Sequence, residues 1–210
     1  MPSLLHIDTS IRRTGSTTRE LSSYFADEWR KERPDAVYTY RDLAVEPIPY
    51  LTSAVRDYIM DPDGDHGVTA EERALVDAVA TEVRNATTVL LAIPMYNYTI
   101  PSTLKAWIDY LVSPAVMVAV GAETGPLSGK PVVVITARGG SYAPGTPREG
   151  RDYQEPYLRA ILDSIGLADD LKFVHAELTL AATVPAMEKL RPLGAKSLAD
   201  AREALRKLAA

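Results

Sequence analysis

Three separated segments of the sequence carry residues of the kinds that bind a cofactor. The first begins at Thr9, and its hydroxyl side chains include Ser10, Ser16, Thr17 and Thr18. The second, residues 94–98, is Pro-Met-Tyr-Asn-Tyr, and the third, residues 137–140, is Ala-Arg-Gly-Gly. Each directly follows a short apolar run with the length of a buried strand. Because loops at the carboxyl ends of parallel strands converge where the strand order reverses, we expect the three segments to build one site.

The first segment suits a phosphate group. It precedes an amphipathic helix, whose N-terminus would offer unpaired N–H groups and about half a positive charge. It lacks the Gly-Lys-Ser/Thr ending of a Walker A loop, and Gly15 alone does not make a dinucleotide fingerprint. The alternative is a structural role, in which Thr17 caps the helix and Glu20 completes a capping box. The two interpretations are compatible, because a cap satisfies only some of the free donors.

The second segment suits the face of a planar ring with a polar edge. Aromatic and sulfur groups from Met95, Tyr96 and Tyr98 can pack against such a ring, and Asn97 can reach its edge. The alternative is local packing of the tyrosines in a loop bracketed by prolines.

The third segment places a cation beside two glycines. Gly139 and Gly140 would let the backbone approach a ligand closely or turn with positive φ. Arg138, which follows Ala137, would favour the anionic reduced form of a bound flavin. The alternative is a glycine turn with a solvated arginine. Taken together, the three segments suit a phosphorylated, planar cofactor, and FMN is the natural candidate.

Composition excludes several other classes of protein. The 210 residues, of which 46% are hydrophobic, predict one globular domain over residues 1–210, and the net charge of −5 disfavours nucleic-acid binding. The absence of cysteine excludes thiol chemistry, so redox chemistry needs a bound cofactor. No histidine has metal-ligand spacing, and we predict no metal site. The sequence has no leader and no membrane-spanning run, which predicts a cytoplasmic protein without membrane contact.

Strand-like and helical patterns alternate along the chain, as in a doubly wound α/β fold with a parallel sheet. The five expected strands are residues 3–8, 37–41, 87–93, 131–137 and 171–177. Helical spacing of apolar residues predicts helices that include residues 21–29, 104–111, 158–165 and 198–208. Residues 46–69 are rich in proline and glycine and are expected to form a surface excursion, as a lid or a dimer contact.

With these residues in view, the sequence resembles the FMN-dependent NADH-azoreductase family, a flavodoxin-like branch of the NAD(P)H:quinone oxidoreductases. The likeness covers nearly the whole chain and rests mainly on the three segments. It implies a three-layer sandwich with a five-stranded parallel sheet in the order 2-1-3-4-5. It also implies an FMN-binding set consisting of Ser10, Ser16, Thr17, Thr18, Met95, Tyr96, Asn97, Tyr98, Ala137, Arg138, Gly139 and Gly140.

The same resemblance implies a function. NADH, or alternatively NADPH, would pass a hydride to FMN N5 and leave, and a quinone or azo compound would then be reduced by two electrons in ping-pong order. Tyr96, Asn97 and Tyr98 would steer the substrate, with no covalent catalyst and no obligatory acid or base. Family members are homodimers with the flavin beside the interface. The alternatives are a flavodoxin-like electron carrier that serves a protein partner, and a flavin-free sensing module.

Overall fold

The computed structural model describes residues 1–210 and is built on one parallel sheet. Its strands are β1 (Ser3–Asp8), β2 (Val37–Asp42), β3 (Thr88–Pro94), β4 (Pro131–Ala137) and β5 (Asp170–Ala176). They lie in the order β2-β1-β3-β4-β5, and every neighbouring pair is parallel. The predicted strands are therefore confirmed to within about one residue at each end, and the predicted strand order is confirmed.

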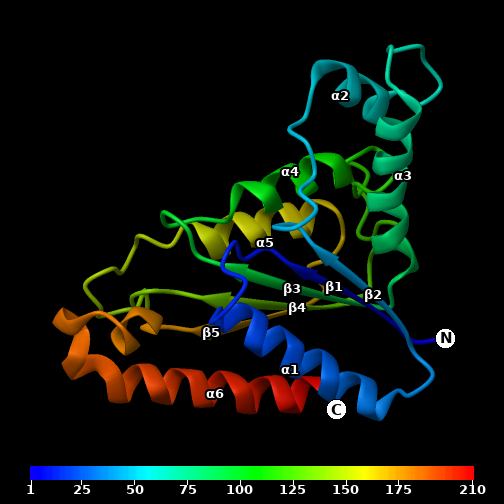
Figure 1. Ribbon diagram of the computed structural model, residues 1–210. Helices are drawn as coiled ribbons and strands as arrows, with labels where there is room; N and C mark the ends of the chain where they lie inside the picture. Colours follow the sequence, from blue (N-terminus) through cyan, green and yellow to red (C-terminus); the bar gives the residue numbers. More distant parts are fainter.

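Helices cover both faces of the sheet, as Figure 1 shows. On one face lie α1 (Thr17–Glu32) and α6 (Arg191–Ala209). The other face carries α3 (Ala70–Asn85), α4 (Ser102–Leu111) and α5 (Gln154–Ser164), with α2 (Ser53–Met60) beyond them. Two short 3₁₀ helices, η1 (Thr179–Ala182) and η2 (Pro185–Leu190), connect β5 to α6. None of the helices is both long enough and apolar enough to cross a membrane.

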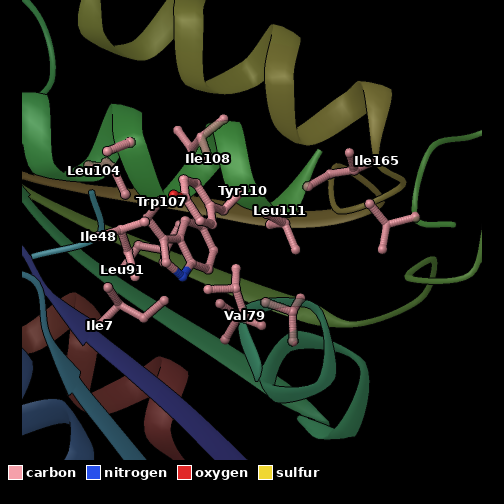
Figure 2. Packing of buried hydrophobic residues seen from close by; sticks show 14 of the residues in the cluster. Ile7, Ile48, Val79, Leu91, Leu104, Trp107, Ile108, Tyr110, Leu111 and Ile165 are labelled. Atoms are coloured by element: carbon pink, nitrogen blue, oxygen red, sulfur yellow. The ribbon is translucent and has the colours of Figure 1, made fainter. Parts of the chain in front are cut away.

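Each face of the sheet has its own hydrophobic core. In the larger core, Trp107 of α4 packs with Ile7 of β1 and Leu91 of β3 (Figure 2). In the smaller core, Phe25 of α1 and Leu205 of α6 are fully buried. Because helices cover both faces, the inner strands are continuous apolar runs rather than alternating ones. This double cover is why the sequence pattern located the strands well.

Residues 46–69 lie mostly at the surface, as predicted, but they contain a short helix that the sequence pattern did not indicate. Within them, α2 buries Val55, Tyr58 and Ile59 in the larger core. The Thr52 side chain caps this helix by accepting a hydrogen bond from the Val55 N–H at 3.2 Å. The prolines and glycines flank the helix and do not interrupt it. The helix thus anchors a largely exposed segment to the larger core, and a role of the segment as a lid or a dimer contact stays a prediction.

The helix α3 was also absent from the sequence prediction. The chain nevertheless carries a signal for it, since Thr69 and Glu72 form a reciprocal capping box at its start. Its buried residues Val76, Val79 and Val83 recur at helical spacing.

Candidate functional site

The three predicted segments meet at one edge of the sheet, where β1, β3 and β4 end (Figure 1). The Tyr96 hydroxyl accepts a hydrogen bond from the Ile11 N–H at 3.2 Å and lies 3.5 Å from Ser10 Oγ, which joins the first two segments. The Met95 N–H donates to the Ala137 carbonyl at 2.9 Å, which joins the second segment to the third. The expected convergence of the three segments is confirmed.

Ser10, Ser16 and Thr18 form a buried chain of hydroxyls in the first segment. Ser16 Oγ donates to Ser10 Oγ at 2.9 Å and lies 3.2 Å from Thr18 Oγ1. Ser16 is the N-cap residue of α1, but its side chain makes no capping hydrogen bond. The alternative cap by Thr17 and Glu20 is wrong, because Thr17 is the first helical residue. The first N–H groups of α1 thus have no side-chain partner, which is what an anion site needs.

Arg19 of α1 ties the first segment to the sheet. Its guanidinium donates to the Ser10 carbonyl at 2.7 and 3.2 Å. It also donates to both carboxylate oxygens of Asp42 at 2.7 and 2.8 Å. Its Nη1 also lies 3.3 Å from Oδ2 of Asp8. The sequence analysis missed this clamp, which fixes the backbone on which the hydroxyls stand.

Asp8 is the buried anion of this network. Tyr40 and Ser22 donate hydroxyl hydrogen bonds to it at 2.8 and 2.9 Å, and His6 Nε2 lies 3.4 Å away. Burial acts to raise the pKa of Asp8, but the hydrogen bonds and the charge of His6 outweigh it, so the pKa is lowered. His6 is itself buried and has a partner on its other ring nitrogen, since its Nδ1 lies 2.8 Å from the Tyr38 hydroxyl.

The second segment forms a tight turn. Tyr96 and Thr99 exchange two backbone hydrogen bonds of 3.0 Å, and Asn97 and Tyr98 between them adopt φ values of 49° and 72°. Left-handed φ is costly for an aromatic residue, and such strain is concentrated at functional sites. The Tyr153 N–H braces the turn by donating to the Tyr98 carbonyl at 3.1 Å. The side chains of Asn97 and Tyr98 stay exposed.

The Arg138 side chain of the third segment is directed into a cluster of carboxylates. Arg138 is 3% exposed. Its guanidinium lies 2.9 Å from Asp152, 3.6 Å from Glu177 and 3.7 Å from Glu155, and the contact to Asp152 is an ion pair without hydrogen-bond geometry. The alternative of a solvated arginine is therefore wrong. Its charge is compensated within the protein, and the expected contact of Arg138 with FMN stays a prediction.

His175 of β5 completes this cluster. Its Nε2 lies 2.8 Å from Glu155 and its Nδ1 lies 2.7 Å from the Thr136 hydroxyl. Burial and the neighbouring Arg138 lower the pKa of His175, although Glu155 acts in the opposite direction. An open groove of about 620 Å³ adjoins the cluster. The sequence did not reveal the acids of the cluster, because they come from the start of α5 and the end of β5, and only the fold brings them to Arg138.

The two glycines of the third segment serve close packing. Neither glycine has a positive φ, so the predicted possibility of a turn with positive φ at these glycines is wrong. A Cβ atom on Gly139 would lie 2.6 Å from Leu180 Cδ1, and one on Gly140 would lie 2.9 Å from Arg148 Cδ. Within this chain the groups that approach the two glycines closely are Leu180 and Arg148, and the close approach of a ligand stays a prediction.

The residues at this edge fit a phosphorylated flavin. The uncapped start of α1 and its hydroxyls suit the phosphate, and the exposed turn around Asn97 and Tyr98 suits the ring. A groove of about 350 Å³ opens beside Thr17, between the starts of α1 and α6. The contacts of the predicted residues with FMN are proposals, taken up below.

Comparison with known proteins identifies the family. The sequence profile of a family described as having a flavodoxin-like fold matches residues 2–200. The chain belongs to this flavodoxin-like family. An FMN-dependent NADH:quinone oxidoreductase of Frankia casuarinae is 42% identical over 207 residues, which cover 98% of each chain. The predicted fold class and family resemblance are therefore confirmed.

Solved structures share the flavodoxin-like fold of this chain. A crystal structure of an azoreductase from Bacillus anthracis matches with a TM-score of 0.84 and 21% identity, covering 100% of this chain and 99% of that one. An FMN-dependent NADH-azoreductase from the same species, solved in complex with FMN, matches with a TM-score of 0.78 and 20% identity over 100% of both chains. At this level of identity the likeness establishes the fold.

Proposed function

We propose that the protein is an FMN-dependent NADH:quinone oxidoreductase that reduces quinones and aromatic azo compounds by two electrons. The name of the Frankia casuarinae relative, which is 42% identical over nearly the full length, supports an oxidoreductase that uses FMN and NADH. The proposal that azo compounds are substrates rests on the resemblance of the three segments to those of the azoreductase family. The observation that carries the proposal is the direct bonding of the three segments beside an uncapped helix N-terminus.

The chain's own residues would bind and orient the cofactor. When bound, FMN would accept a hydride equivalent from NADH and deliver two electrons to the acceptor. The hydroxyls and the free N–H groups of α1 would hold its phosphate. The ring would lie against the second segment, and its polar edge would meet the backbone of the third. The proposed FMN ligands are Ser10, Ser16, Thr17, Thr18, Met95, Tyr96, Asn97, Tyr98, Ala137, Arg138, Gly139 and Gly140.

Asn97 and Tyr98 are the best placed residues to steer the substrate. Both side chains are exposed on the turn, whereas the Tyr96 hydroxyl is occupied by the Ile11 N–H at 3.2 Å. Tyr96 therefore positions the first segment, and we assign no residue as an obligatory acid or base. Donor and acceptor would use the same open face in turn, which gives a ping-pong order and parallel lines in double-reciprocal rate plots.

The first experiment is an anaerobic titration of the FMN-loaded protein. We expect a yellow protein that is bleached by NADH in one two-electron step and regains its colour with a quinone. Two resolved one-electron steps and no reaction with NADH would instead indicate an electron carrier. A protein that stays colourless after incubation with FMN would indicate a flavin-free module.

We further propose a homodimer with the FMN site near the interface. Light scattering after size exclusion should give twice the chain mass of 22.9 kDa. A mass of one chain at micromolar concentration would contradict the dimer. A single FMN-binding domain over residues 1–210 and a cytoplasmic location stay predictions.

A further inference from the structure

Arg148, in the loop after β4, lies at the candidate site without a carboxylate partner. Its Nη1 donates to the Tyr142 hydroxyl at 3.1 Å, and its guanidinium carbon lies 5.8 Å from the centroid of that ring. The side chain is exposed and forms no ion pair. Arg138 is the opposite case, since it is buried among three carboxylates at 2.9 to 3.7 Å. Of these two arginines, only Arg148 presents an uncompensated charge.

Arg148 lies against the third segment and is linked to the second through Tyr142. Its Cδ and Nε atoms lie 2.9 Å from the position that a Gly140 Cβ would occupy. Tyr142, which binds the guanidinium, also packs edge to face with Tyr98 at a centroid distance of 6.4 Å. Arg148 therefore lies beside Gly140, and Tyr142 connects it to the turn that would receive the ring.

We infer that Arg148, rather than Arg138, supplies the positive charge at the polar edge of the bound flavin and favours its reduced form. This inference rests on the proposed function, because it requires FMN at this edge. Reduction places additional negative charge on the ring, and a fixed cation nearby stabilises that charge. The carboxylates around Arg138 outnumber its single positive charge, so that cluster cannot provide the same stabilisation.

The test compares the reduction potential of bound FMN in Arg148→Gln and in the matched control Arg151→Gln. Arg151 is an exposed arginine of the same loop that makes no side-chain contact with Tyr142, so its loss changes the net charge equally. We expect Arg148→Gln to weaken the binding of reduced FMN relative to oxidised FMN about tenfold, which corresponds to ~30 mV for a two-electron couple. Arg151→Gln should leave the potential unchanged, and Arg148→Lys should keep most of the wild-type value.

An unchanged potential in Arg148→Gln, or an equal shift in Arg151→Gln, overturns the inference. A raised KM for NADH with an unchanged potential also overturns it, because the charge would then act on the phosphates of the donor. The potential is measured with redox dyes and dithionite, without NADH. Wild-type protein that binds FMN but is not reduced by NADH therefore contradicts the proposed function alone. Wild-type protein that binds no FMN overturns both.

Discussion

Ser16 is an N-cap residue whose hydroxyl does not cap its own helix. A serine at an N-cap usually accepts a hydrogen bond from the helix backbone. Here its hydroxyl bonds to Ser10 and Thr18 instead, at 2.9 and 3.2 Å. Thr69 at the start of α3 makes the ordinary cap, with Glu72 N–H donating to its hydroxyl at 3.2 Å. The first N–H groups of α1 therefore have no side-chain cap, whereas the start of α3 is capped.

Substitution of the two N-cap residues should separate binding from stability. We expect Ser16→Ala to weaken FMN binding about tenfold, because a hydrogen bond to a charged group contributes about 1.5–3 kcal/mol. Thr69→Ala should lower the free energy of unfolding by about 1 kcal/mol and leave FMN affinity unchanged. Fluorescence titration with FMN and urea unfolding measure the two quantities. Equal FMN affinity in Ser16→Ala and wild type would argue against a phosphate at α1.

At the scale of elements, the connection between β5 and α6 braces the third segment. The Leu178 N–H donates to the Gly140 carbonyl at 3.1 Å, and the Thr179 N–H donates to the Arg138 carbonyl at 3.0 Å. Leu180 of η1 fills the space beside Gly139. The predicted ring-edge site is thus shaped by an element that follows it by about forty residues of chain. The two meet because β4 and β5 pair in parallel, with Ala137 opposite Ala176.

Gly139→Ala should disturb this brace through Leu180. The new Cβ would lie 2.6 Å from Leu180 Cδ1, and we expect a loss of about 1–3 kcal/mol in unfolding free energy together with weaker FMN binding. Leu180→Ala alone should cost less than about 1 kcal/mol, because the side chain is 43% exposed. The double variant Gly139→Ala/Leu180→Ala should recover most of the unfolding free energy that Gly139→Ala loses. A double variant no better than Gly139→Ala would mean that the clash lies with the backbone.

At the scale of the whole molecule, buried charges couple folding to pH. The pKa of His175 is lowered by burial and by Arg138, so the unfolded chain binds a proton at this residue before the folded protein does. Stability contributed in this way is present above the unfolded pKa of about 6.5 and falls as the pH drops below it. The lowered pKa of Asp8 acts in the same direction but only below about pH 4.

His175→Gln should flatten the pH dependence of stability between about pH 5 and 7. The measurement is urea unfolding of the two proteins across this range. A His175→Gln protein with the wild-type slope would place the titrating group elsewhere.

The sequence alone determined the strands, their order through the family resemblance, and the three segments of the site. It could do so because buried strands are short apolar runs, and because parallel strands carry their ligand-binding loops at one edge. It did not reveal α2, whose eight residues lie between prolines and glycines and are helical largely because Val55, Tyr58 and Ile59 are buried.

Only the tertiary structure decided how the site's charges are paired. Arg138 meets carboxylates from residues 152–177, and Ser16 leaves the helix start uncapped in favour of Ser10. Such pairings depend on distances between residues that are remote along the chain, and side-chain type and spacing do not encode them. The sequence therefore predicted which segments meet at this edge of the sheet, whereas the fold decided that Arg148, and not Arg138, is exposed there without a carboxylate partner.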